Sequence, residues 1–186
     1  MRNEIFDELM ESVQEMDEVV KMKPREILKK VKSLLGDNGI LVSDVGKHKM
    51  EIAKHYPTTK PNTVLISNGF CSMTGGLSGA IGAWLAVPGQ KIMAIIGDGG
   101  FQMSMSEMET AKRLNANITV QVWCDGGYGL IKYKQDMQFG KHTELDFGNP
   151  KFQLIAEAFG WFYTEDLEEA LNYEGPALVV QPVTYK

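Results

Sequence analysis

The chain has 186 residues, 44% hydrophobic and 23% charged, which is typical of one globular domain with a sizeable core. Its net charge of −5 argues against a nucleic-acid partner, and its two cysteines form neither a disulfide framework nor a zinc site. It has no run of the ~18 apolar residues that a membrane span needs, and its acidic start is unlike a signal peptide, so we expect a cytoplasmic protein.

The first part of the chain predicts two helices and a strand. Residues 1–22 carry an apolar stripe at helical spacing, which predicts a linker or docking helix before the main domain, residues 23–186. Pro24 suits the first turn of a second helix that ends near Leu35. Residues 40–43 predict the first strand of the sheet.

Two loops follow this strand, and the pattern of the first indicates a place for an anion. Residues 44–48, Asp-Val-Gly-Lys-His, lead into a helix whose free N–H groups suit an anion. Residues 63–66 predict a strand, and the glycine-rich loop 67–76 opens onto a helix of small residues. On pattern alone, His48 is predicted to be a surface residue at a helix start.

The centre of the chain, residues 91–130, predicts strand, turn, helix, strand and turn. The two strands, 91–96 and 118–123, are short apolar runs of the kind found in buried parallel sheets. The helix between them, 104–115, begins with Ser and Glu at capping-box spacing. Each strand is followed by a glycine-rich turn that carries one aspartate.

These aspartates, Asp98 and Asp125, should lie together. Consecutive parallel strands of one sheet end on the same edge, where open α/β sheets bind ligands. Two carboxylates flanked by glycines suit Mg²⁺, which completes its coordination with water and phosphate oxygens. The residues therefore predict a metal-bridged phosphate site, although the pattern alone fits ordinary turn aspartates equally well.

Two other interpretations of this region are less favoured. The chain lacks a GxGxxG motif, because Gln102 stands where the third glycine would be, and this weighs against a dinucleotide site. Cys124 is interpreted as a small buried residue rather than as a nucleophile.

The last third predicts a helix over 130–141, a helix over 149–159 and a closing strand over 176–183. Only Phe162-Tyr163-Thr164 precedes the helix expected at Glu165. Strands and helices alternate along the chain, which predicts an α/β fold with a doubly wound, mostly parallel sheet and helices on both faces.

Gly97-Asp98-Gly99, followed by residues 100–124 and then Asp125, resembles the thiamine diphosphate signature. With further matching stretches, the chain resembles the C-terminal, diphosphate-binding domain of catabolic acetolactate synthases over roughly residues 24–184. The resemblance implies that Asp98, Asp125 and the main-chain carbonyl of Gly127 hold Mg²⁺, which in turn holds the diphosphate. The other matching stretches are 44–48, 67–69, 72–73, 79–83 and 146–149.

The resemblance also implies the remaining cofactor contacts. Gly46 and His48 would contact the diphosphate, Met73 would bend the cofactor, and the carbonyl of Cys71 would accept from its 4′-amino group. The chain departs from the family at Lys47, whose role is open, and at Thr74 and Ser78. The other expected contacts lie in the two turns: Gly97, Asp98, Gly99, Gly100, Asp125, Gly127, Tyr128, Gly129 and Leu130.

The function implied is decarboxylation of pyruvate and condensation with a second 2-ketoacid. Lys134 replaces a Trp of the anabolic enzymes, which favours the catabolic type. The family's catalytic glutamate belongs to a pyrimidine-binding domain outside this chain, either of the same enzyme or of a partner subunit. FAD, if the full-length protein uses it, would also bind outside this chain. We expect a homo-oligomer without a nucleic-acid or membrane partner.

Two alternatives stay open at this point. The chain could be the β-type subunit of another thiamine diphosphate-dependent decarboxylase, such as a sulfopyruvate decarboxylase. It could also be a non-catalytic α/β module that binds phosphate. A titration with thiamine diphosphate and Mg²⁺ separates the second alternative from the enzymes.

Overall fold

The computed structural model describes residues 21–185. Nearly all of the linker or docking helix expected over 1–22 therefore lies outside the described residues. Met22, at its end, is extended and pairs in parallel with Val183 beyond the last strand. The boundary between the two expected segments stays a prediction.

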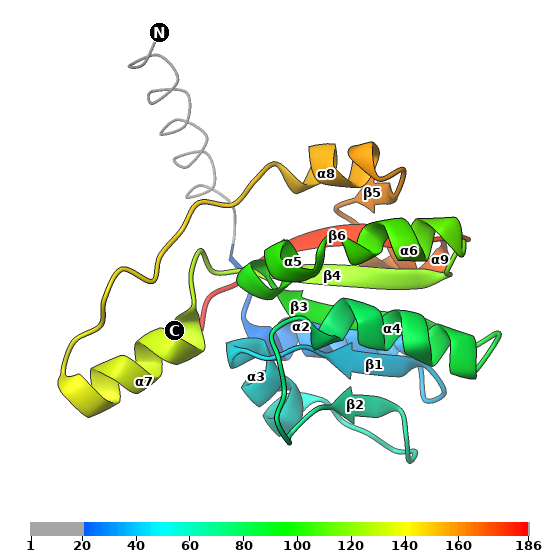
Figure 1. Ribbon diagram of the computed structural model, residues 1–186. Helices are drawn as coiled ribbons and strands as arrows, with labels where there is room; N and C mark the ends of the chain where they lie inside the picture. The colour runs from blue at the N-terminus through cyan, green and yellow to red at the C-terminus, as the bar shows by residue number, and fades with distance from the viewer. Residues whose placement is uncertain (1–20, 186) are drawn as a thin grey trace, which may run out of the picture.

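The described residues form one six-stranded parallel sheet with the strand order β2-β1-β3-β4-β6-β5 (Figure 1). The two central strands are buried along almost their whole length, as their near-continuous apolar sequences require. Gly97 pairs with Trp123, so these strands end side by side at one edge. The strands are β1 Ile40–Ser43, β2 Val64–Ile66, β3 Ile92–Gly97, β4 Ile118–Cys124, β5 Phe162–Thr164 and β6 Ala177–Pro182.

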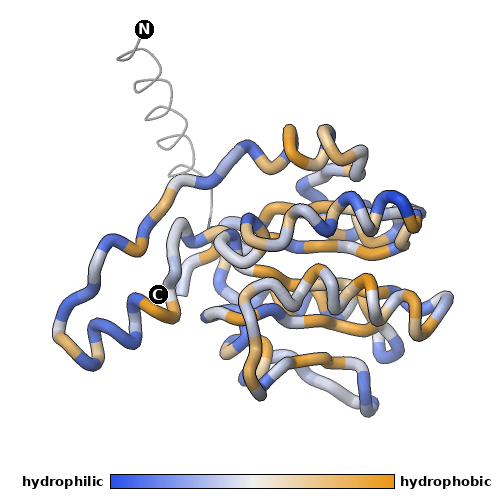
Figure 2. Tube along the Cα trace, in the orientation of Figure 1, coloured by the Kyte–Doolittle hydropathy of each residue, from blue (hydrophilic) through white to orange (hydrophobic). Residues whose placement is uncertain are grey.

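Helices cover both faces of the sheet, which confirms the doubly wound α/β fold. One core lies beneath α4, α5, α6 and α8, and the other beneath α2, α3 and α9. Figure 2 shows hydrophobic residues concentrated on the central strands between these layers. The helices are α2 Pro24–Leu35, α3 Lys47–His55, α4 Gly75–Ala86, α5 Asp98–Ser104, α6 Glu107–Arg113, α7 Gly129–Phe139, α8 Phe152–Ala158 and α9 Leu167–Asn172.

Helix α7 differs from the others because none of its residues is buried. It stands away from the sheet and is joined to α8 by a long loop (Figure 1). Within residues 21–185, no helix combines the length and apolar character needed to cross a membrane. Because none of its residues is buried, α7 is the least covered helix among the described residues.

The structure corrects the prediction of one helix over 104–115. Helix α5 begins directly at Asp98, and α6 begins only at Glu107. The Ser104 hydroxyl donates to the carbonyl of Gly100, one turn back, instead of capping a helix start. The two glycines after Asp98 favoured the prediction of a turn. A helix can also contain glycines, at positions where neighbouring atoms leave no room for a side chain.

The short segment after Trp161 forms a real strand. β5 has three residues and pairs in parallel with β6, which places it at the edge of the sheet. An edge strand has only one neighbour, so three residues are enough to complete this side of the fold.

Candidate functional site

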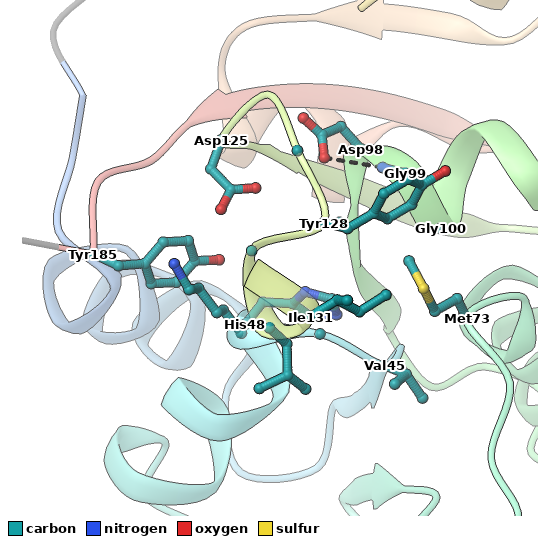
Figure 3. Close-up of a pocket in the computed structure, with 16 residues that line it drawn as sticks. Val45, His48, Met73, Asp98, Gly99, Gly100, Asp125, Tyr128, Ile131 and Tyr185 are labelled. Carbon is teal, nitrogen blue, oxygen red and sulfur yellow. Dashed lines mark hydrogen bonds between the residues drawn. The ribbon is translucent and has the colours of Figure 1, made fainter. Parts of the chain in front are cut away.

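The carboxyl ends of β1, β3 and β4 open into a pocket (Figure 3). The space between its walls is about 490 Å³, part of which is open to solvent. Every expected cofactor contact except Cys71 lines it: Gly46, His48, Met73, Gly97, Asp98, Gly99, Gly100, Asp125, Gly127, Tyr128, Gly129 and Leu130. The lining residues not expected as contacts are Val45, Lys47, Ile131 and Tyr185.

Asp98 joins the two glycine-rich turns at the pocket. As the first residue of α5, its negative charge is favourable at the helix N-terminus. Its side chain is almost fully buried, with Oδ1 accepting from the N–H of Gly99 at 2.9 Å. Oδ2 accepts from the N–H of Gly126 and from Nδ2 of Asn149, both at 2.9 Å. The bond to Gly126 ties the start of α5 to the loop after β4.

Asp125 supplies the second carboxylate of the site. Desolvation in the pocket, and then the negative charge of Asp98, raise the pKa of Asp125 to about 6. Figure 3 shows both side chains at the same side of the pocket. A side chain at Gly129 would collide with the Asp125 carboxylate, so glycine lets the loop approach this closely. Two neighbouring carboxylates that repel one another are suited to a divalent cation.

The donor set is small for a metal site. Within the described part of the chain, no group of three or more His, Cys, Asp or Glu side chains could hold a metal ion. The two aspartates are therefore a site that needs a main-chain oxygen, water or ligand oxygens to complete it, as Mg²⁺ sites commonly do. Gly127, the expected carbonyl ligand, lines the same pocket.

His48 is buried, and the pattern-based prediction of a surface histidine is wrong. Only 2% of the residue is exposed, and burial lowers the pKa of His48 to about 4, so the ring is neutral at pH 7. Its Nε2 atom is buried without a hydrogen-bond partner. A side chain at Gly46 would lie 2.7 Å from the ring, so glycine is needed at this helix start. An orphaned polar atom beside a pocket marks a place for a polar ligand atom or water.

Lys47 brings a positive charge to the site. It is the one lysine or arginine among the described residues that line this pocket. Its Nζ lies 5.2 Å from the centre of the Tyr185 ring, in a cation–π arrangement, and its side chain runs beside Gly129. Lys47 also acts to lower the pKa of Asp125. Tyr185 follows the last strand and carries no motif, so sequence reasoning missed it.

The segment Glu144–Asn149 folds back over the second turn. Asp146 pairs antiparallel with Gly127, and Phe147 N–H donates to the carbonyl of Gly126 at 3.0 Å. The Phe147 and Tyr128 rings lie 4.9 Å apart, with Tyr128 on the pocket side. The sequence indicated this segment only as part of the resemblance. Its contacts join residues that are separated along the sequence by the whole of α7. Pairing between such distant residues has no local sequence signal.

The glycine-rich loop before α4 supplies one of its two expected contacts. Met73 lines the pocket, and Figure 3 shows its side chain on the side away from Asp125. Cys71 lies outside the lining, and its Sγ accepts from Lys49 Nζ at 3.7 Å. Cys124 is buried, and burial raises the pKa of its thiol, which supports a packing role.

Comparison with known proteins agrees with this geometry. The family described as "Thiamine pyrophosphate enzyme, C-terminal TPP binding domain" matches residues 44–180. An acetolactate synthase of Bacillus subtilis (strain 168) is 34% identical over 87% of this chain and 30% of its own length. A catabolic acetolactate synthase of Raoultella terrigena is 34% identical over 89% of this chain and 31% of its own length.

A third relative, the large subunit of acetolactate synthase isozyme 1 of Escherichia coli (strain K12), is 32% identical over 82% of this chain and 29% of its own length. The chain thus spans about 30% of the relatives that it matches. The family match covers most of the chain and includes every residue that lines the pocket except Tyr185. The chain belongs to the family of C-terminal TPP-binding domains of thiamine pyrophosphate enzymes.

Proposed function

We propose that the chain is the cofactor-binding domain of an acetolactate synthase. It would bind thiamine diphosphate (thiamine pyrophosphate) through Mg²⁺ for the decarboxylation of pyruvate and its condensation with a second 2-ketoacid. The observation that carries this proposal is the bond between Asp98 and Gly126, which brings both halves of the signature into one pocket. The similarity to acetolactate synthases, including a catabolic one, supports the choice of reaction.

The residues of the pocket fit this cofactor. Asp98, Asp125 and the carbonyl of Gly127 would hold Mg²⁺, whose positive charge offsets the repulsion that raises the pKa of Asp125. Gly46 at the start of α3 and the unpartnered Nε2 of His48 leave room and polar capacity for the diphosphate. The bound cofactor would supply the carbanion stabilisation, while the protein orients it and excludes water.

This chain provides one side of the proposed active site. The glutamate that acts on the pyrimidine ring, and FAD where it is used, would come from domains outside the chain. Helix α7 supports an association with such a domain, since it begins at the pocket and carries exposed apolar side chains along its length. The most exposed of them are Ile131, Tyr133, Met137 and Phe139. We further propose a cytoplasmic homo-oligomer.

A calorimetric titration tests the proposal. The chain should bind thiamine diphosphate when Mg²⁺ is present and lose most of this affinity when a chelator removes the metal. A non-catalytic phosphate-binding module would instead bind inorganic phosphate and thiamine diphosphate with similar strength. Equal affinity with and without chelator would contradict the metal-bridged site.

Replacing Lys47 with Gln should weaken cofactor binding by about tenfold. A hydrogen bond to a charged group contributes about 1.5–3 kcal/mol, and Lys47 is the one cationic side chain lining the pocket among the described residues. The salt dependence of binding should also become shallower, because one cation is lost. Both quantities come from calorimetric titrations at several salt concentrations.

Lys54→Gln is the matched control for Lys47→Gln. Lys54 lies on the same helix, but it is exposed and lies outside the pocket lining. This variant should therefore bind the cofactor as the wild type does. Equal affinities in all three proteins would mean that Lys47 serves only to pack against Tyr185.

A further inference from the structure

The hydrogen bonds of Asp98 leave little of its carboxylate free. A carboxylate offers about four lone-pair positions, two on each oxygen. Oδ2 accepts two hydrogen bonds, from Gly126 N–H and Asn149 Nδ2, and Oδ1 accepts one, from Gly99 N–H. By this count, Oδ2 is fully used and the position left for a metal belongs to Oδ1.

Asn149 is itself held in one orientation. Its Oδ1 accepts from Nε2 of Gln102 at 3.0 Å, so its NH₂ group is the part that faces Asp98. Gln102 stands four residues after Asp98 on α5, so hydrogen bonds run from Gln102 through Asn149 to Asp98 and link α5 to the 144–149 segment. The bond from Gln102 therefore fixes the Asn149 amide in the orientation in which its NH₂ group donates to Asp98.

We propose that Asn149 is a positioning residue that makes Asp98 a one-oxygen metal ligand and thereby favours Mg²⁺ over Ca²⁺. This inference rests on the proposed function, in which Asp98 binds the metal. Mg²⁺ requires near-octahedral geometry with short bonds, which single oxygens from separate ligands satisfy. Ca²⁺ accepts more ligands and takes carboxylates through both oxygens. Because Oδ2 of Asp98 already accepts two hydrogen bonds, binding of a metal through both carboxylate oxygens is disfavoured.

The other contacts of the 144–149 segment separate this role from simple anchoring. The segment is also held by the main-chain bonds of Tyr128 to Leu145 and of Phe147 to Gly126, and by an ion pair of Lys132 with Asp146 at 3.0 Å. Loss of the Asn149 side chain leaves all of these in place. A change in metal preference would then follow from Asp98 rather than from movement of the segment.

The test compares Mg²⁺ and Ca²⁺ affinities of the wild type and Asn149→Ala by calorimetric titration in the presence of thiamine diphosphate. Outer partners of metal ligands typically affect metal affinity by 10–100-fold, and we expect a loss of that size for Mg²⁺. Ca²⁺ should lose several-fold less, so the ratio of Ca²⁺ to Mg²⁺ affinity should rise. Thermal denaturation of each protein checks that the fold is retained.

Two controls complete the experiment. Lys132→Ala removes the other side-chain anchor of the same segment and should leave the metal ratio unchanged. Asn172→Ala removes an exposed amide whose oxygen accepts from Lys91. Asn172 is far from Asp98 in the sequence, and this variant should leave the Mg²⁺ and Ca²⁺ affinities unchanged.

The outcomes that contradict the proposals are distinct. A Ca²⁺ to Mg²⁺ ratio in Asn149→Ala no higher than in the wild type overturns the role of Asn149 and leaves the proposed function standing. A ratio that rises equally in Lys132→Ala assigns the effect to the segment and also overturns it. If the wild type binds no thiamine diphosphate with either metal, the proposed function falls and this inference falls with it.

Discussion

The Asp98→Ala variant should lose metal-dependent binding of thiamine diphosphate almost completely. The substitution removes the proposed metal ligand and also the acceptor for three hydrogen bonds, from Gly99, Gly126 and Asn149. Loss of an outer partner already costs roughly 10–100-fold in metal affinity, so loss of the ligand should cost on the order of 100-fold or more. Calorimetric titration with cofactor and Mg²⁺ measures the effect.

Asp125→Asn should be much milder. An amide oxygen still coordinates Mg²⁺, and removal of one negative charge ends the repulsion between the side chains at positions 98 and 125. The comparison of the two variants therefore separates the loss of a ligand from the loss of a charge.

The control for both aspartate variants is Asp37→Ala. Asp37 is exposed and pairs with Lys32 on α2, so its loss should leave the cofactor affinity unchanged. Thermal denaturation shows whether each variant is folded. Wild-type affinity in a folded Asp98→Ala protein would mean that the carboxylate does not hold the metal.

The sequence predicted the elements whose signals are local. The apolar runs of β3 and β4 and the helix beginning at Pro24 were predicted within a few residues, because burial on both faces and helix-start chemistry act over short stretches. The placement of Asp98 and Asp125 at the same edge followed from the rule that consecutive parallel strands of one sheet end on the same side, which is a rule of topology rather than of propensity.

The misses have a common physical cause. Helix α5 begins at Asp98 and contains the two glycines that follow it. Glycine is required at position 100 because this position packs directly against the Asp44 carboxylate and a side chain would not fit. The burial of His48 and the pairing of Asp146 with Gly127 also depend on contacts between distant parts of the chain. Local pattern carries no record of such contacts, so only the resemblance pointed to these residues.

The exposed surface beside the pocket also differs from the expected one. From their positions on loops and helix starts at this edge, the sequence predicts an apolar patch, covered by a partner domain, that contains Phe70, Met73, Leu130 and Ile131. Phe70 is fully exposed in a left-handed conformation, with φ at 45°, and Ile131 is 42% exposed. Met73 and Leu130 are instead partly buried in the pocket lining. The exposed apolar residues continue along α7, which the sequence did not single out.

The purified chain should make no acetolactate from pyruvate, even with saturating thiamine diphosphate and Mg²⁺. The resemblance implies that the catalytic glutamate belongs to a domain outside the chain, and we propose that the pocket between β1, β3 and β4 holds only part of the cofactor. Orientation of reacting groups contributes on the order of 7–11 kcal/mol to catalysis in favourable cases, and a half-site cannot provide it. Turnover by the chain alone, well above that of free cofactor, would contradict this expectation.

Addition of a separately expressed pyrimidine-binding domain of an acetolactate synthase should produce a mixed complex with measurable activity. Met137 and Phe139 on α7 are 72% and 63% exposed, and exposed apolar side chains on a helix with no buried residue are typical of an interface. Without the second domain, the same surface should make the chain self-associate, most simply as a two-fold dimer. Light scattering and pyruvate turnover measure the two effects.

Variants of α7 decide whether this helix forms the interface. Met137→Glu should prevent both self-association and the mixed complex while leaving the affinity for thiamine diphosphate unchanged, because Met137 lies outside the pocket. Leu154→Glu on α8 is the control, since Leu154 is similarly exposed, at 57%, but lies outside α7 and the pocket lining. A chain that stays monomeric at all concentrations and ignores the second domain would place the interface elsewhere. If both variants disrupt the complex equally, charge rather than the α7 surface is responsible.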